Sequence, residues 1–133
     1  MGTRIEVEPA ERRRTSRWPC GCEAFHPVDC FHDMADPAGA AKHVRAKLKP
    51  GGSWMLVEPF AKDKPEENHN PIGKLFYSAS TMICVGVSLA QKGPALGAQA
   101  GEAKIREIVT KAGFTRFRRA TETPFNLVFE ARP

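Results

Sequence analysis

The sequence lacks the features that mark secreted, membrane-spanning and nucleic-acid-binding proteins. Its opening, MGTRIEVEPAERRRTSRWP, carries charges where a signal peptide needs an apolar core. No stretch of about eighteen apolar residues is evident, so a membrane span is not expected. Aromatic residues are few, with one Tyr and two Trp, and the net charge of +5 is spread over several segments. A cytoplasmic protein without a membrane or nucleic-acid partner is therefore expected.

The four cysteines do not predict a disulfide framework, because three of them lie in the first quarter of the chain. We expect all four to be reduced. A zinc site is a second interpretation, since five potential ligands fall within thirteen residues. The single residue between the paired cysteines suits tetrahedral zinc poorly, so no metal is predicted. These five are Cys20, Cys22, His26, Cys30 and His32.

The chain of 133 residues, 41% of them hydrophobic, can bury one core. Residues 1–27 show no sustained period of two or 3.6 and are expected to be mostly irregular, whereas residues 28–133 read as a folded unit. Asp36 is a good N-cap and Pro37 suits the first helical position. Apolar residues then recur at helical spacing until Pro50-Gly51-Gly52, which predicts a helix ending there.

A strand is predicted over residues 53–58, because Trp54-Met55-Leu56-Val57 is apolar without alternation. That pattern is typical of a strand buried on both faces of a parallel sheet. The strand ends abruptly at Glu58-Pro59. Open α/β sheets bind ligands at the carboxyl ends of their strands, so Glu58 is a site candidate.

The remaining pattern predicts an α/β fold whose sheet closes with an antiparallel hairpin. Residues 60–71 read as a loop, and 72–89 as a helix. Its part over 76–89 is apolar nearly all round, so the helix is either buried or lines an apolar pocket. A short amphipathic helix over 105–112 ends at Gly113. Two strands follow, over 114–121 and 125–131, with a tight connection between them.

The order of these elements and their residues resembles the C-terminal half of class I S-adenosylmethionine-dependent methyltransferases, from Asp29 to Pro133. The resemblance rests on DCFHDMADP after the fourth strand of that fold, LKPGGSWMLVEP for the next helix end and strand, and AGFTRFRRATETPFNLVFEARP for the last helix and hairpin. STMICVGVSLAQ and ALGAQAGEA are similar to one group of bacterial small-molecule methyltransferases. The implied fold is a partial Rossmann-like sheet without its N-terminal strands.

The resemblance implies a catalytic set. His32, in a histidine-aspartate pair, would be the general base on a substrate hydroxyl, with Asp33 and Glu58 as orienting acids. Met34 stands where that motif usually has tryptophan, which leaves the acceptor atom open. The other interpretation is that His32 and Asp33 form only a polar turn before a helix, and that Glu58 only ends a strand.

The resemblance also implies ligand contacts. Asp29, Cys30 and Phe31 would present the strand-end backbone to the cofactor, S-adenosylmethionine. Tyr77, Ser80 and Met82 would lie in the pocket of a small-molecule methyl acceptor, although an apolar helix of this kind more often belongs to a core.

The glycine-rich loop with which the family binds its cofactor is missing, as is the acid that holds the ribose. The fourth strand also looks short, with only Phe25, Val28 and Phe31 to serve in it. Two explanations fit: a truncated or misjoined reading frame, or a fragment whose partner half lies in another chain. On either one we expect cofactor binding to be weak or absent and the chain to be inactive alone. The alternative function is a non-catalytic remnant or interaction module that pairs through an exposed sheet edge, with another chain or a second copy.

Overall fold

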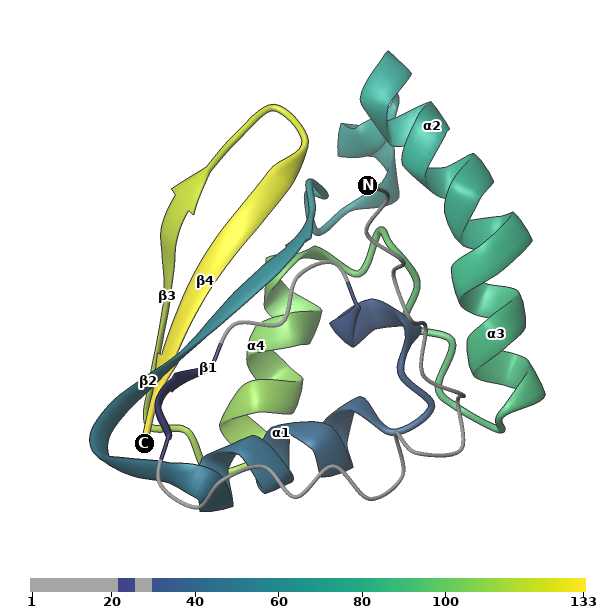
Figure 1. Ribbon diagram of the computed structural model, residues 1–133. Coiled ribbons are helices and arrows are strands. Elements are labelled where there is room, and N and C mark those ends of the chain that lie inside the picture. The colour runs from purple at the N-terminus through teal and green to yellow at the C-terminus, as the bar shows by residue number, and fades with distance from the viewer. Residues whose placement is uncertain (1–21, 26–29) are drawn as a thin grey trace, which may run out of the picture.

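The computed structural model describes residues 22–25 and 30–133, with side chains from Cys30 onward, and shows a mixed four-stranded sheet (Figure 1). The strand order is β1-β2-β4-β3. β1 runs parallel to β2, whereas β4 is antiparallel to both β2 and β3, so β3 and β4 form the expected closing hairpin. The strands are β1 (Cys22–Phe25), β2 (Leu48–Pro59), β3 (Arg116–Glu122) and β4 (Asn126–Arg132).

β1 lies within the segment 1–27 that is expected to be mostly irregular, and Phe31, a candidate for the fourth strand, is not part of it. Cys22–Phe25 forms the strand, and Phe31 begins a 3-10 turn, η2 (Phe31–Asp33). A four-residue strand has too few positions to show a period. It forms because the edge of β2 offers main-chain partners, as in the pairing of Phe25 with Trp54.

α1 (Pro37–Lys47) begins where the sequence predicts. Asp36 Oδ1 accepts a hydrogen bond of 2.7 Å from the Gly39 N–H, and Pro37 occupies the first helical position. β2 starts earlier than predicted, because Leu48 already pairs with Cys22. The intervening Pro50-Gly51-Gly52 forms an irregularity within the strand, where Gly51 adopts a φ of +81°.

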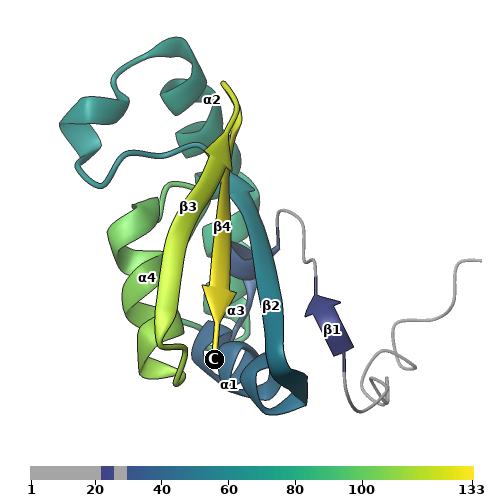
Figure 2. The ribbon, with the colours of Figure 1, turned by 90° about the vertical axis from the view of Figure 1, so that its left-hand side faces the viewer.

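The helices cover only one face of the sheet, as the two views show (Figures 1 and 2). Trp54 and Leu56 of β2 point into the core, whereas Met55 and Val57 on the opposite face are only partly buried. The prediction that both faces of β2 are buried is therefore wrong for the described residues, because no described helix covers the second face. The core is formed by residues from η2, α1, β2, α4, the segment between α4 and β3, and β4. These residues are Phe31, Ala41, Trp54, Leu56, Ile105, Val109, Phe114, Leu127, Phe129 and Ala131.

Residues 71–90 form one continuous helical segment with an unusual burial pattern. α2 (Pro71–Ala79) continues through a π-helical turn, η4 (Ser80–Cys84), into α3 (Val85–Ala90). The face toward the protein carries the small residues Ser80, Cys84 and Ser88, at a spacing of four. The large apolar residues face outward: Leu75, Tyr77, Met82, Ile83, Val87 and Leu89.

Of the two alternatives expected for this segment, burial is wrong, because Met82 is 82% exposed and Ile83 is 59% exposed. By length and composition it could also cross a membrane, because its best window has a mean hydropathy of 1.4 and includes serines, a threonine and glycines but few charges. Mostly buried core helices of soluble proteins meet the same criterion, whereas only 22% of this window is buried. The two buried serines attach the segment to the rest of the chain through hydrogen bonds.

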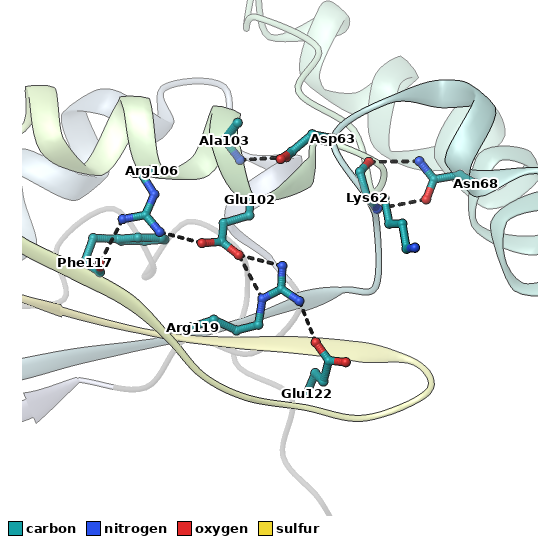
Figure 3. Close-up of polar contacts among 9 residues, drawn as sticks. All are labelled: Lys62, Asp63, Asn68, Glu102, Ala103, Arg106, Phe117, Arg119 and Glu122. Carbon is teal, nitrogen blue, oxygen red and sulfur yellow. Dashed lines mark hydrogen bonds and ion pairs between the residues drawn. The ribbon is translucent and has the colours of Figure 1, made fainter.

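α4 (Gly101–Lys111) is fixed to the loop after β2 and to β3 by polar contacts (Figure 3). Asp63 Oδ1 accepts a hydrogen bond of 2.7 Å from the Ala103 N–H in the first turn. Glu102 lies between Arg106 of the same helix and Arg119 of β3. Burial alone would raise the pKa of Glu102, but hydrogen bonds from Arg119 and Arg106 outweigh it and lower that pKa.

Replacing Glu102 with Gln should lower the free energy of unfolding at pH 7 by about 1 kcal/mol, measured by urea denaturation. Because the pKa of Glu102 is lowered on folding, its contribution is fully present above the unfolded-state value near 4.5 and is lost as the pH falls through the folded value. The two proteins should therefore converge in stability below pH 4.5. Glu66→Gln, at an exposed position on η3 (Pro65–Asn68), is the charge-matched control. An unchanged difference at low pH would contradict this assignment.

Candidate functional site

Glu58 lies at the carboxyl end of β2, on the same side of the strand as Trp54 and Leu56. This follows from the period of two along a strand. Its side chain is therefore directed toward the core, and only 2% of the residue is exposed. A carboxylate in such a place is stable only when its oxygens are paired. Both oxygens of Glu58 contact the turn η2.

η2 is held against β2 by Phe31. The ring of Phe31 is fully buried and packs edge-on against Trp54, with 5.5 Å between ring centroids and an interplanar angle of 82°. Two backbone hydrogen bonds close the turn, from Asp33 N–H to the Cys30 carbonyl and from Met34 N–H to the Phe31 carbonyl. The next residue, His32, is thereby placed beside the end of β2.

Glu58 and His32 form a buried pair. Glu58 Oε2 lies 2.6 Å from His32 Nδ1, and Glu58 Oε1 accepts a hydrogen bond of 3.1 Å from the Phe31 N–H. A carboxylate can only accept, so the proton in this contact lies on Nδ1. In the neutral ring, Nε2 then carries the lone pair. The arrangement fixes the tautomer that a general base needs.

Asp33 lies on the other side of the ring. Its Oδ1 is 3.2 Å from His32 Nε2, and its side chain is 36% exposed. Within the described residues Asp33 Oδ1 has no hydrogen-bond partner of its own. Two carboxylates flanking one imidazole stabilise its protonated form, so a proton taken up at Nε2 is held there electrostatically. The structure thus brings His32, Asp33 and Glu58 together.

Cys84 joins this group, and the sequence analysis missed it. One ligand-type atom each from His32, Asp33 and Cys84 lie within 4.8 Å of one another. Burial raises the pKa of the Cys84 thiol to about 11, and a hydrogen bond with Asp33 adds to the effect. The available signal was the spacing of four between Ser80, Cys84 and Ser88, which places three small polar side chains on one helix face.

The acceptor-pocket candidates do not lie together. Ser80 faces inward, where its Oγ accepts a hydrogen bond of 2.9 Å from the Ala98 N–H. Tyr77 and Met82 face outward and line a shallow surface depression with Ser78 and Thr81. Ser80 therefore does not share a surface with Tyr77 and Met82, because the helix presents its small residues, not its large ones, to the protein, and the pocket role of these residues stays a prediction.

Of the cofactor-contact candidates, Asp29 lies outside the described residues. Cys30 is half-buried. The Phe31 side chain belongs to the core, and its N–H is bound by Glu58, so neither is directed to a ligand. A zinc site is the second interpretation of the cysteine-rich segment. The side chains of three of its potential ligands, Cys20, Cys22 and His26, also lie outside the described part of the chain.

Several methyltransferase structures have a fold similar to that of this chain. A candidate O-methyltransferase from Nostoc punctiforme PCC 73102 superposes with a TM-score of 0.63 at 13% identity, over 87% of this chain and 33% of that one. Human N-acetylserotonin methyltransferase, solved in complex with SAM, superposes with a TM-score of 0.58 at 17% identity, over 83% of this chain and 29% of that one. The mitomycin 7-O-methyltransferase MmcR superposes with a TM-score of 0.59 at 18% identity, over 87% of this chain and 31% of that one. The chain has part of the methyltransferase fold.

The chain spans about a third of the length of these methyltransferase structures. The expected partial α/β sheet with a closing antiparallel hairpin is confirmed by this likeness and by the strand order. No protein-family model and no curated protein matches the sequence. At these identities the methyltransferase likeness concerns the fold.

Replacing Glu58 with Ala should lower the free energy of unfolding by about 3 kcal/mol, because it leaves His32 Nδ1 and the Phe31 N–H in a buried place without their partner. Glu58→Gln keeps an acceptor of the same size and should cost less. Urea denaturation measures both. Nitrogen-detected NMR of the His32 ring should show the proton on Nδ1 in the wild type, and an Ala variant as stable as the wild type would refute the pairing.

The thiol of Cys84 should lose its proton only at high pH. In a variant that keeps only this cysteine, with Cys20, Cys22 and Cys30 changed to Ser, the alkylation rate should keep rising up to about pH 11, because the thiolate is the reactive form. Mass spectrometry of iodoacetamide-treated samples gives the rate at each pH. A plateau near pH 9 would mean that burial and Asp33 do not act on this group.

Proposed function

We propose that this chain supplies the acid–base part of an S-adenosylmethionine-dependent methyl transfer to a small hydroxylated acceptor. The observation that carries the proposal is the buried Glu58–His32 pair at the carboxyl end of β2, with Asp33 at the second ring nitrogen. Ligands of open α/β sheets bind at this end of the strands. Support also comes from the fold, which the chain shares with a third of each O-methyltransferase described above.

In this proposal His32 Nε2 accepts the proton of the acceptor hydroxyl as its oxygen attacks. Glu58 keeps the ring proton on Nδ1 and directs Nε2 away from β2. Asp33 then stabilises the imidazolium that forms. The chemistry that S-adenosylmethionine supplies when bound is an activated methyl group on a sulfonium.

The described residues do not by themselves fit the methyl donor. Among them, glycines with positive φ serve turns and the start of α4, at Gly51, Gly97, Gly101 and Gly113, and none of these lies in a strand-to-helix loop of G-x-G-x-x-G spacing. The Phe31 N–H is already bound by Glu58. We therefore place donor binding on residues outside the described part or on another chain, with weak or absent binding by this chain alone.

The acceptor side of the proposal uses the outward face of the long helix. Tyr77 and Met82 would form one wall of an apolar pocket when further residues of a methyltransferase cover that face. The buried thiol of Cys84 is compatible with a reducing compartment, so a cytoplasmic setting is part of the proposal.

A second candidate function is an interaction module, and two observations favour it. β1 stands at the end of the strand order, so one of its edges has no neighbouring strand among the described residues. The outward face of the long helix is apolar, with Leu75, Ile83 and Leu89 each more than half exposed. Either surface would pair with another chain.

The coding sequence immediately upstream, read in every frame, separates these candidates. A glycine-rich loop after an apolar strand would indicate an enzyme of which this chain is a piece, and its absence in all frames would favour the interaction module. In the extended enzyme, His32→Ala should lower the single-turnover rate of methyl transfer by about 10²- to 10⁴-fold. His43→Ala, at an exposed position on α1, is the matched control. An unchanged rate in His32→Ala would remove the base assignment.

Calorimetric titration of this chain with S-adenosylmethionine tests the placement of the donor site. We expect no binding in the micromolar range, because the described residues contain no cradle for the nucleoside or the methionine part of the donor. Heats that fit a micromolar dissociation constant would overturn this part of the proposal while leaving the role of His32 open to the kinetic test.

A further inference from the structure

We propose that His32 Nε2, Asp33 Oδ1 and Cys84 Sγ form a binding site for a thiophilic divalent cation such as Zn²⁺. The three groups come from η2 and from the end of the π-helical turn η4. Their ligand-type atoms lie within 4.8 Å of one another. This site differs from the cysteine-rich alternative considered from the sequence, because Cys84 lies far from that segment in the chain.

The histidine is already oriented as a metal ligand. Its Nδ1 faces Glu58 Oε2 at 2.6 Å inside the protein, and its Nε2 lies 3.2 Å from Asp33 Oδ1 on the other side of the ring. A ligating histidine almost always donates its other N–H to a carboxylate or carbonyl, which fixes the ring and makes the free nitrogen a better donor. Glu58 supplies that contact and is itself anchored by the Phe31 N–H.

The distances suit a small tetrahedral ion. With bonds of about 2.0–2.3 Å, neighbouring ligand atoms of a tetrahedral zinc site lie roughly 3.3–3.8 Å apart. His32 Nε2 and Asp33 Oδ1 are 3.2 Å apart, and no pair in the group exceeds 4.8 Å. The widest pair therefore has to close by about 1 Å. Asp33, whose side chain is about one-third exposed, provides the path of entry.

The donor set selects the class of cation. Imidazole and thiolate ligands favour Zn²⁺ and its analogues, whereas Mg²⁺ and Ca²⁺ prefer sites made only of oxygen. On binding, the Cys84 thiol releases its proton to solvent and the sulfur donates an electron pair to the cation. Asp33 Oδ1, which has no hydrogen-bond partner within the described part of the chain, gains one ligand bond. A water molecule completes the fourth position.

The cation and an acceptor hydroxyl would use the same lone pair of His32. Bound Zn²⁺ would therefore block the base of the proposed methyl transfer and act as an inhibitor. The site itself does not depend on that function, since its ligands are defined by geometry and its binding can be measured on this chain without a methyl donor.

Cobalt titration of the metal-free chain tests the site. We expect one equivalent of Co²⁺ to produce a thiolate-to-cobalt charge-transfer band together with the intense visible bands of tetrahedral cobalt, and Zn²⁺ to abolish both. Cys84→Ala should lose the charge-transfer band. The variant with Cys20, Cys22 and Cys30 changed to Ser should keep it. Glu58→Gln should weaken cobalt binding by about 10- to 100-fold, because Glu58 orients His32.

Circular dichroism and urea denaturation of each variant establish that the protein is folded before the metal is added. His32→Gln serves as a second ligand variant if Cys84→Ala does not fold, and it should lose the tetrahedral visible bands. A charge-transfer band that survives in Cys84→Ala, or one that disappears in the triple Ser variant, would overturn the proposal. So would the absence of any band in the folded wild type at equimolar cobalt.

Discussion

The contact between Glu58 and His32 is the interaction on which the site depends. A carboxylate removed from water costs several kcal/mol unless partners replace its hydration, and Glu58 is almost completely buried. Its two oxygens are satisfied by His32 and by the Phe31 N–H, both of which belong to η2. The same contact therefore closes the end of β2, fixes the turn and sets the tautomer of the histidine.

The packing around this contact explains why the turn lies where it does. Phe31 enters the core beside Trp54, which in turn contacts Phe114 at 5.2 Å between ring centroids. Apolar burial thus determines the position of the backbone, and the charged pair determines the direction of the side chains that follow it. Removing the aromatic anchor would displace His32 even though no polar contact had been changed.

Part of this arrangement could be predicted from the sequence. Asp36 and Pro37 marked the start of α1, and Glu58 stood out because an acid directly followed an apolar strand. Cys84 could not be predicted, because its approach to His32 depends on how a helix docks and on a π-helical turn within it. The apolar composition of residues 76–89 predicted a helix that is buried or lines an apolar pocket. Composition cannot distinguish these alternatives from an exposed helix, because exposure depends on which neighbouring elements cover the helix. β1 could not be predicted either, because it forms by pairing with the edge of β2 and its four residues show no period in the sequence.

The long helix is attached in a way that has a dynamic consequence. The hydroxyls of Ser80 and Ser88 hold it to the loop over residues 92–101, while its large apolar side chains add little to that attachment. An element held by few polar contacts opens at a lower free energy than the sheet, and it can do so without global unfolding. Cys84 travels with this helix, whereas His32 and Glu58 belong to the turn and the strand. Opening the helix would separate the sulfur from the imidazole and leave the carboxylate–histidine pair assembled.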